Sequence, residues 1–447
     1  MSDRLFGTDG IRGRANEHPM TAEMALKVGR AAGMLFLQEN RPHTILIGKD
    51  TRLSGYMIEN ALTAGLCSVG IRVLLTGPLP TPGVSYIMRS LRCDGAFMIS
   101  ASHNPYEDNG IKLFGPDGYK IADAMEDEIA RLISSGEVDR YRPTGAQIGT
   151  ARRIDDAVGR YIEFVKATFP KGMRLDGLRI VVDCAQGATY KIGPNTLTEL
   201  GAQVITLGDR PNGVNINDKL GAVFPEEMRA TVIREKADLG IAFDGDGDRI
   251  AMADEDGRLL EGNALLAIIA ADKLERNELP SKTIVTNIMA NGGLDRALAP
   301  WGGSVVRSNV GDRHVVEAMR AQGLTVGGES SGHIVLLDHN TTGDAMIAAL
   351  QVLAILVGRN QPLSELARVY QPLPECLRKV SFEGRPKPAQ PVLDKLLEDM
   401  ADEISGAALV VVRPSGTEPA VRVMVQHDQL RKAETLAQVI ADRVEAL

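Results

Sequence analysis

Residues 98–112 read Met-Ile-Ser-Ala-Ser-His-Asn-Pro-Tyr-Glu-Asp-Asn-Gly-Ile-Lys, and an apolar strand predicted at residues 96–99 leads directly into their polar part. The Asn-Pro pair biases the chain out of helical conformations and holds a sharp turn open. Ser102 lies in this turn beside His103, where we expect an exposed hydroxyl surrounded by backbone N–H groups and a cation. A nucleophilic or phosphate-carrying hydroxyl needs such surroundings. An ordinary Ser/Asn-rich turn after a buried strand has the same local sequence.

The pattern of a strand, a helix, a second strand and a later third strand occurs three times. The predicted strands are residues 45–47, 73–75 and 96–99, then 180–182, 204–206 and 240–243, and finally 283–286, 304–306 and 324–326. The predicted helices are residues 56–68, 194–200 and 294–299. Strands that alternate with helices predict parallel or mixed α/β sheets.

Each third strand leads into the densest polar cluster of its copy, at residues 100–105, 244–249 and 327–333. Ligands of open α/β sheets bind beyond the carboxyl ends of the strands, so the three clusters predict one shared cleft. The alternative is chance recurrence of common α/β units, because the repeat is topological and does not match residue by residue.

The remaining segments complete the organisation. Residues 24–35 and 157–167 show helical spacing of apolar residues, and the Pro-rich residues 361–374 are typical of a linker. After it we expect a small α+β domain of a different kind. Its predicted elements are strand 379–382, helix 389–404, strands 408–413 and 420–426, and helix 430–445.

Composition excludes several classes of function. The 447 residues suffice for three or four domains, and the net charge of −8 without any Lys/Arg run argues against a nucleic-acid partner. Four scattered cysteines favour a reducing cytoplasm and argue against a thiolate metal site. The N-terminus is charged and Gly-rich, unlike a signal peptide. The apolar residues 264–271 and 346–357 are too short to span a bilayer and predict buried helices, so we expect no membrane partner.

The acidic cluster reads Asp244-Gly-Asp246-Gly-Asp248-Arg249. Alternation in an extended loop would put the three carboxylates on one side, where a hard divalent cation such as Mg²⁺ binds. Asp-Gly is also a hairpin signal, but three unpaired acids in a turn would repel one another. A calcium EF-hand fails because Arg249 occupies the glycine position and the flanking residues predict strands. Arg249 would then face an anion beside the metal, most simply a phosphate.

Two further loops carry ligand-binding groups. Glu329 and Ser331 lie on a Gly-rich turn whose carboxylate and hydroxyl suit a polyhydroxylated ligand, whereas we expect His333 to be structural. A later turn offers guanidinium, hydroxyl and backbone N–H groups typical of a phosphate cradle. Its residues are Arg413, Ser415, Gly416, Thr417 and Arg422. An ordinary hairpin with surface arginines is the alternative.

With these four loops in order, the chain resembles the α-D-phosphohexomutase superfamily over nearly its whole length. Residues 6–13 (Phe-Gly-Thr-Asp-Gly-Ile-Arg-Gly), 48–52 (Gly-Lys-Asp-Thr-Arg) and 310–313 (Val-Gly-Asp-Arg) are similar to its bacterial glucosamine-phosphate branch. The resemblance implies four domains around a central cleft. They would be a phosphoserine domain (1–153), a metal-binding domain (154–255), a sugar-binding domain (256–370) and a phosphate-binding domain (371–447).

The resemblance also implies roles for single residues. Ser102 would carry a phosphate that joins Asp244, Asp246 and Asp248 in holding one Mg²⁺. Glu329 and Ser331 would bind sugar hydroxyls, and the loop from Arg413 to Arg422 would hold the distal phosphate. Arg12, His103, Lys112 and Arg249 would line the transfer site, with Lys112 as a candidate general acid or base.

The implied activity is that of an isomerase, an intramolecular phosphotransferase that interconverts glucosamine 6-phosphate and glucosamine 1-phosphate. The reaction would pass through a 1,6-bisphosphate and supply UDP-N-acetylglucosamine and cell-wall precursors in the cytoplasm. A hexosamine 1,6-bisphosphate or another phosphate donor would activate the enzyme. The enzyme would be a monomer or a homodimer. The alternatives are a glucose- or mannose-phosphate mutase of the same superfamily, a non-catalytic sugar-phosphate binder, and a serine phosphohydrolase, which would not need the distal phosphate loop.

Overall fold

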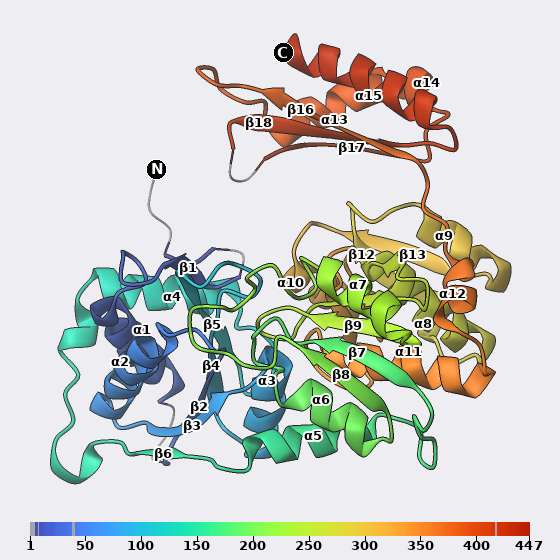
Figure 1. Cartoon of the computed structure of the whole chain (residues 1–447). Coiled ribbons are helices and arrows are strands. Elements are labelled where there is room, and N and C mark those ends of the chain that lie inside the picture. Colours follow the sequence, from blue (N-terminus) through green and yellow to red (C-terminus); the bar gives the residue numbers. More distant parts are fainter. Residues whose placement is uncertain (1–4, 8, 38–40, 416–417) are drawn as a thin grey trace.

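The structure, a computed structural model, describes residues 5–447 except residues 8, 38–40, 416 and 417. Four β-sheets, each with its own helices, follow one another along the chain (Figure 1). We call the parts built on these sheets the first, second, third and C-terminal units. The first three sheets mix parallel and antiparallel strands, as the sequence predicts.

The first unit contains a six-stranded sheet of order β1-β5-β4-β2-β3-β6. Its strands are β1 (Ile11–Arg14), β2 (Thr44–Lys49), β3 (Arg72–Pro78), β4 (Gly95–Ile99), β5 (Asp108–Phe114) and β6 (Ala151–Arg153). Its helices are α1 (Ala22–Phe36), α2 (Gly55–Ser68), α3 (Thr81–Ser90) and α4 (Asp123–Ser134), with short 3-10 turns η1 (Glu137–Asp139) and η2 (Gly145–Gln147). Thr21 caps the N-terminus of α1, because its hydroxyl accepts the N–H of Met24, and the helix buries the apolar face predicted from the sequence.

The second unit contains a five-stranded sheet of order β11-β10-β9-β7-β8, and the third a four-stranded sheet of order β13-β12-β14-β15. The second has α5 (Ala157–Ala167), β7 (Arg179–Asp183), α6 (Ile192–Glu199), β8 (Gln203–Leu207), α7 (Glu226–Glu235), β9 (Leu239–Phe243), β10 (Ile250–Ala253) and β11 (Leu259–Leu260). The third has α8 (Gly262–Glu275), η3 (Pro280–Lys282), β12 (Thr283–Asn287), α9 (Gly293–Leu298), η4 (Ala299–Trp301), β13 (Ser304–Ser308), α10 (Asp312–Gln322), β14 (Val326–Gly328), β15 (Ile334–Leu336), α11 (Ala345–Arg359), α12 (Leu363–Leu366) and η5 (Ala367–Val369).

These three units share one strand topology. A central strand (β2, β7 or β12) pairs in parallel with the second strand of its copy on one side and with the third on the other. The third strand (β4, β9 or β14) then pairs with an antiparallel strand that follows it in the chain. The structure therefore contains the predicted topological repeat, and each third strand ends at one of the three polar clusters.

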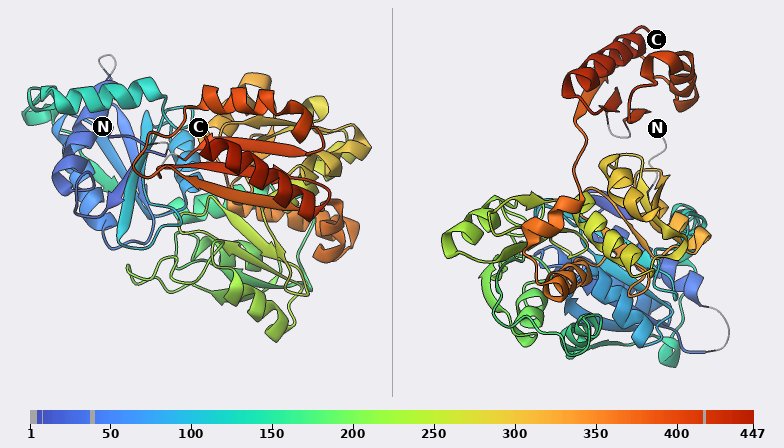
Figure 2. Two further views of the ribbon diagram at one scale, coloured as in Figure 1. Left: turned by 90° about the horizontal axis from the view of Figure 1, so that it is seen from above. Right: turned by 90° about the vertical axis from the view of Figure 1, so that its right-hand side faces the viewer.

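The C-terminal unit has a three-stranded antiparallel sheet of order β16-β18-β17, covered by helices. Its elements are β16 (Glu375–Ser381), α13 (Gln390–Asp399), α14 (Ala401–Ile404), β17 (Leu409–Pro414), β18 (Ala420–Gln426) and α15 (Leu430–Glu445). This unit stands apart above the other three (Figure 1 and the right-hand view of Figure 2). Seen from above, it lies over the region between the first and third units (Figure 2, left).

The hydrophobic cores follow the same division. One cluster of buried apolar residues runs through the first three units and includes residues of α3, α5, α8 and α11. A buried hydrogen bond of 2.8 Å from the Tyr161 hydroxyl on α5 to Asp344, which caps α11, joins the second unit to the third. The C-terminal unit has a core of its own. It is therefore linked to the rest mainly by the chain after η5 and by hydrogen bonds such as Gly292 N–H to Gln426 Oε1, 2.8 Å.

Several expectations about elements need correction. The strand expected at residues 379–382 begins four residues earlier, at Glu375, and the helix expected at residues 389–404 is two helices, α13 and α14, which meet at Met400. The sequence analysis places one helix in each copy, but α3, α7 and α10 add a second between the second and third strands. The third strand of the third copy begins two residues later than expected, at Val326. The predicted linker at residues 361–374 is helical in its first half, because the apolar residues Leu363 and Leu366 are buried against the third unit.

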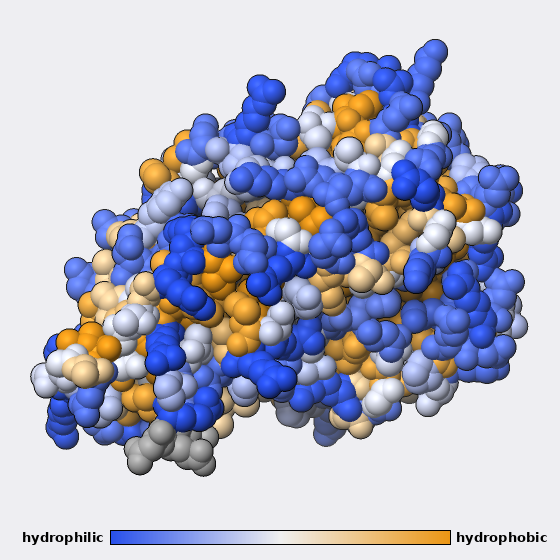
Figure 3. Space-filling view, turned by 90° about the horizontal axis from the view of Figure 1, so that it is seen from below, coloured by the Kyte–Doolittle hydropathy of each residue, from blue (hydrophilic) through white to orange (hydrophobic). Residues whose placement is uncertain are grey.

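Within the described residues, no single helix is long and apolar enough to cross a membrane. Helix α11 and the helical residues 363–369 are long and apolar enough only when they are taken together, and a bend of 100° separates them. Eleven of the fifteen residues of α11 are buried inside the protein. On the face seen from below, hydrophobic residues appear in separate groups among hydrophilic ones (Figure 3).

Candidate active site

The Ser102 turn leaves the carboxyl end of β4. The Ser100 hydroxyl donates to Asp50 Oδ2 (2.7 Å) and accepts the Ser102 N–H (2.8 Å). Ser102 has φ +50°, in the left-handed region that non-glycine residues rarely adopt. Contrary to expectation the serine is buried, with 1% of its surface exposed, because the acidic loop of the second unit covers it. Its hydroxyl donates to Asp244 Oδ2 at 2.6 Å.

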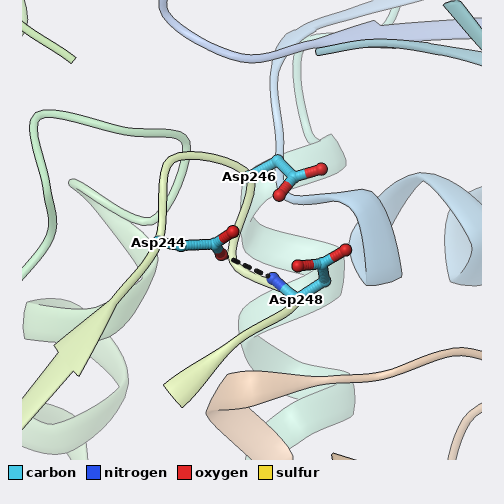
Figure 4. A group of neighbouring side chains, drawn as sticks. All are labelled: Asp244, Asp246 and Asp248. Carbon is cyan, nitrogen blue, oxygen red and sulfur yellow. Dashed lines mark hydrogen bonds between the residues drawn. The ribbon is translucent and has the colours of Figure 1, made fainter. Parts of the chain in front are cut away.

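The acidic loop follows β9 and brings three carboxylates together (Figure 4). One ligand oxygen each from Asp244, Asp246 and Asp248 lies within 4.8 Å of the other two. The loop is not extended, as the alternation suggested, but forms a tight turn with Gly247 at φ +71°. Asp244 Oδ1 closes the turn by accepting the N–H groups of Asp248 (3.1 Å) and Arg249 (3.2 Å).

The carboxylates fit a divalent cation. Asp246 Oδ1 and Asp248 Oδ1 are buried and accept no hydrogen bond within the described residues. Burial and the neighbouring carboxylates raise the pKa of Asp244 well above its usual range. Burial acts the same way on Asp248, but Lys112 and His333 outweigh it and hold its pKa low. Buried carboxylate oxygens without donors are the ligands that hard cations such as Mg²⁺ take.

Lys112 lies on β5 and faces this loop. Its Nζ is 3.0 Å from Asp246 Oδ2, 3.3 Å from Asp9 Oδ2 and 3.6 Å from Asp248 Oδ2. Burial alone would lower the pKa of Lys112, but the three carboxylates outweigh it and raise the pKa above its ordinary value. In this arrangement Lys112 is held as an ammonium among the three carboxylates and supplies positive charge beside the acidic loop. Its role as a general acid or base stays a prediction.

His103, Arg12 and Arg249 lie beside the serine turn and the acidic loop, and we call all these groups together the inner site. Arg249 Nη1 lies 2.8 Å from His103 Nδ1, which must accept because guanidinium groups only donate. Burial, then Arg249 and Arg12, lower the pKa of His103 to about 4, so the imidazole is neutral near pH 7. Arg12 Nε and Arg249 Nε are buried without an acceptor among the described residues. These donors suit an anion between them, such as a phosphate.

A cavity of about 890 Å³ opens beside the inner site. Arg12, Asp248 and Arg249 line it from one side, and Glu329 and Ser331 of the third unit from the other. Glu329 Oε1 accepts from Asn287 Nδ2 (2.6 Å) and from the Gly311 N–H (3.2 Å). His333 also lines the cavity. Its Nδ1 is 3.7 Å from Asp248 Oδ2 and its Nε2 is 3.8 Å from Asp312 Oδ2, so this histidine, which we expected to be only structural, is also part of the site.

We call residues 413–422 the distal loop, and its described residues do not line this cavity. Arg413 on β17 and Arg422 on β18 lie directly opposite each other. Burial and the facing Arg422 lower the pKa of Arg413, whose Nε is buried without an acceptor in the described part of the chain. Ser415 is buried, and its Oγ accepts the Glu418 N–H at 3.3 Å. Gly416 and Thr417, the other predicted members, lie outside the described residues.

Like charges opposite each other destabilise a sheet. Glu418 Oε2, 3.4 Å from Arg422 Nη2, offsets part of this repulsion, and an anionic ligand between the two arginines would offset more of it. None of the described residues of the distal loop lines the 890 Å³ cavity, because the C-terminal unit stands apart in this structure.

Several groups of the site escaped the sequence analysis. Asp9 bonds to Arg12, Lys112 and Lys120, and Lys120 Nζ reaches Asp312 Oδ2 at 2.5 Å, so an ionic chain joins the first and third units. Asp9 lies in the motif at residues 6–13 and Asp312 in the motif at residues 310–313, so the motifs could have indicated both residues. Lys120 carries no such signal.

Comparison with known protein families places the whole chain in one group. Residues 3–139 match the phosphoglucomutase/phosphomannomutase α/β/α domain I, residues 159–257 match domain II, residues 261–373 match domain III, and residues 357–443 match the C-terminal domain. The chain belongs to the phosphoglucomutase/phosphomannomutase family. Membership accounts for the three repeated units followed by one of a different kind.

Within this family, the chain is similar over its whole length to phosphoglucosamine mutases. A phosphoglucosamine mutase of Anaeromyxobacter dehalogenans is 52% identical over 450 residues, covering 99% of this chain and 98% of the relative. The phosphoglucosamine mutase of Myxococcus xanthus is 49% identical over 442 residues, covering 99% and 96%.

Solved structures of family members have the same fold. A phosphoglucomutase/phosphomannomutase family protein from Burkholderia thailandensis matches with a TM-score of 0.82 at 24% identity, covering 99% of this chain and 98% of that one. The Aspergillus fumigatus N-acetylphosphoglucosamine mutase, solved with GlcNAc-6P and magnesium, matches with a TM-score of 0.66 at 20% identity, covering 99% and 95%.

Proposed function

We propose that the protein is a phosphoglucosamine mutase, which interconverts glucosamine 6-phosphate and glucosamine 1-phosphate through a phosphoserine and a 1,6-bisphosphate. The observation that carries the chemistry is the 2.6 Å contact of the Ser102 hydroxyl with Asp244, inside a triad of buried carboxylates. The choice of glucosamine rests on the phosphoglucosamine mutases that are about half identical over the whole length.

Asp244, Asp246 and Asp248 would hold the Mg²⁺ beside the phosphate of Ser102. When bound, the cation offsets negative charge on the phosphate as the transfer begins. Arg12 and Arg249 would bind the phosphate oxygens through their guanidinium groups, whose Nε atoms have no acceptor among the described residues. Catalysis of phosphoryl transfer is mainly positioning and electrostatic stabilisation, and these residues are placed for both.

In the first half-reaction a sugar hydroxyl attacks the phosphorus atom. The bond from phosphorus to the sugar oxygen forms as the bond to Ser102 Oγ breaks, which gives the bisphosphate. The proton that the sugar hydroxyl loses is balanced by the proton that Ser102 Oγ gains. The bisphosphate then turns round and returns its other phosphate to Ser102. Glu329 would hold sugar hydroxyls in both orientations, because Asn287 and Gly311 occupy only its Oε1 and fix the carboxylate.

The distal phosphate would be held by Arg413, Ser415, Gly416, Thr417 and Arg422. Since Arg413, Ser415 and Arg422 do not line the cavity, substrate binding would draw the C-terminal unit towards the other three. Within this scheme we place the phosphoserine domain at residues 1–153, the metal-binding domain at 154–255, the sugar-binding domain at 256–370 and the phosphate-binding domain at 371–447. Activation would need a hexosamine 1,6-bisphosphate or another phosphate donor, and we place the enzyme in the cytoplasm.

The test is turnover of glucosamine, glucose and mannose phosphates side by side, each with Mg²⁺ and a trace of the matching bisphosphate. We expect the highest kcat/KM for the glucosamine phosphates. Higher values for glucose or mannose phosphate would contradict the assigned substrate but would still support a phosphohexomutase. No turnover of any of the three would contradict the proposal that the protein is a mutase.

Replacing Arg422 with alanine should weaken the binding of both glucosamine phosphates about ten- to a hundredfold, since it removes a charge-assisted contact worth about 1.5–3 kcal/mol. The bisphosphate should also escape more often between the two transfers, so the variant should depend more on added bisphosphate. Turnover with and without added bisphosphate, and phosphorus NMR of released intermediate, measure both effects.

Arg431→Ala is the matched control, because Arg431 is exposed on α15, which packs on the hydrophobic face of the same sheet. It should behave like the parent. If Arg422→Ala bound both substrates like the parent and released no extra bisphosphate, the loop would have no part in the mechanism.

A further inference from the structure

The main chain of Ser102 is held in an uncommon conformation. Its φ of +50° is rare for a residue with a side chain, and such conformations persist only where surrounding contacts impose them. None of the site roles proposed above accounts for those contacts. The Ser100 hydroxyl accepts the Ser102 N–H, and the contacts to the Ser102 carbonyl come from two further side chains, one in the first unit and one in the second.

Arg52 is the contact from the first unit, and it is fully buried. Its Nη2 donates to the carbonyl oxygens of Ser102 (2.9 Å) and Asn104 (2.8 Å). Its Nη1 donates to the carbonyls of Pro105 and Asp108. Its Nε donates to Asp50, whose Oδ2 also accepts the Ser100 hydroxyl. Arg52 therefore directs the planar fork of its guanidinium at the main chain of the serine turn.

Asn217 is the contact from the second unit and lies in the segment between β8 and α7. Its Nδ2 donates to the carbonyl oxygens of Ser102 and Asn104, both at 2.9 Å, which are the same two acceptors as those of Arg52 Nη2. The backbone N–H of Asn217 donates to Ala185 at 2.8 Å, which ties Asn217 to its own unit.

The acidic loop lies against the same place. A Cβ atom added to Gly245, between two of the aspartates, would be 2.7 Å from the Ser102 carbonyl oxygen and 2.8 Å from Asn217 Nδ2. The serine turn, the Asn217 amide and the backbone of the acidic loop are thus packed against one another. A small shift of the turn would change the distance from Ser102 Oγ to the carboxylates.

We propose that Arg52 and Asn217 form a clamp across the first two units, which fixes the Ser102 main chain so that its hydroxyl faces the acidic loop. Both are positioning residues, because neither contacts Ser102 Oγ. The proposal rests on the proposed function only in taking Ser102 as the phosphate carrier. Phosphoryl transfer depends on positioning, and displacement of a reacting group by about 1 Å can cost about a hundredfold in rate.

Asn217 is the better of the two to test. A carbonyl oxygen accepts two hydrogen bonds, so both acceptors keep their bond to Arg52 when Asn217 is lost. Asn217→Ala therefore leaves neither carbonyl without a donor and should fold. A small loss of stability is expected, because Asn217 has φ +58°, where asparagine is favoured over alanine. Arg52→Lys, which keeps the charge but loses the fork, is a second variant and should be affected more strongly.

The experiment compares Asn217→Ala with Thr51→Val. The Thr51 hydroxyl donates to the Gln186 carbonyl at 2.6 Å, so Thr51→Val also removes a hydrogen bond between the first two units but leaves the serine turn untouched. We measure the melting temperature, Mg²⁺ affinity, kcat and KM, the rate of phosphoryl transfer in rapid-quench experiments, and hydrogen exchange of peptides that cover residues 100–108.

For Asn217→Ala we expect kcat and the transfer rate to fall about ten- to a hundredfold, with KM and Mg²⁺ affinity unchanged within about threefold. Amide exchange at residues 100–108 should be faster, and Thr51→Val should match the parent. Transfer at the parent's rate, or a loss that only follows lower stability or weaker Mg²⁺ binding, would overturn the clamp. If the parent itself turned over no hexose phosphate, the proposed function would fail, and the exchange data alone would then decide the clamp.

Discussion

Replacing Ser102 with alanine is expected to abolish mutase activity, with a loss of roughly a thousandfold or more in turnover. The reaction has no other phosphate carrier in this scheme. Ser102 Oγ lies 2.6 Å from Asp244, in the turn beside His103 and Arg249, and Thr81, whose hydroxyl is equally close to Asp246, has no role as a carrier in the scheme. The variant should fold, since it loses one hydrogen bond and keeps the backbone contacts of the turn with Arg52. Turnover of glucosamine 6-phosphate, together with circular dichroism and the melting temperature, measures both expectations.

Ser134→Ala, at the exposed end of α4, is the control for this variant and should keep the parent's activity. Phosphopeptide mapping of the active parent should place its stoichiometric phosphate on Ser102. A stoichiometric phosphate on another residue, or substantial activity in Ser102→Ala, would show that a different group carries the phosphate.

The strands of the three copies were predictable because each is a short apolar run bounded by glycine or polar residues. The second helix of each copy was not. Helix α7 buries only Met228, Thr231 and Val232, so its apolar stripe is too narrow to give a helical period. Helix α3 begins with Thr81-Pro82-Gly83, which is typical of a turn, although proline is well placed in the first turn of a helix.

The chemical groups of the site were predictable because they are concentrated in short motifs. The contacts that arrange them were not, since they join residues far apart in the sequence. Arg52 and Asn217 reach Ser102 across 50 and 115 residues. The burial of Ser102 depends on the loop of a different unit, which local sequence does not show. Lys112 was likewise predicted as a site residue, but its ion pair with Asp9 was not, because the two residues are far apart in the sequence.

Replacing Asp246 with asparagine should weaken metal binding and reduce turnover by about a hundredfold or more at limiting Mg²⁺. Asp246 Oδ1 is buried without a donor in the described structure, while Oδ2 accepts from Thr81 (2.6 Å) and Lys112 (3.0 Å). Asparagine keeps the shape but removes the charge that attracts the cation. KM for the sugar phosphate should change little, because Glu329 and the distal loop are untouched. Turnover measured across a series of Mg²⁺ concentrations separates the two effects.

Excess Mg²⁺ should restore part of the activity of Asp246→Asn, since a weakened site fills at higher concentration. Asp256→Asn makes the same charge change at an exposed position of the same unit, in the turn between β10 and β11, and should leave the Mg²⁺ dependence unaltered. Chelation should inactivate the parent, and added Mg²⁺ should restore it. A chelated parent with full activity, or an Asp246→Asn variant with the parent's Mg²⁺ dependence, would mean that the three carboxylates act without a cation. Lys112, held as an ammonium among Asp246, Asp9 and Asp248, would then be the main positive charge that compensates them.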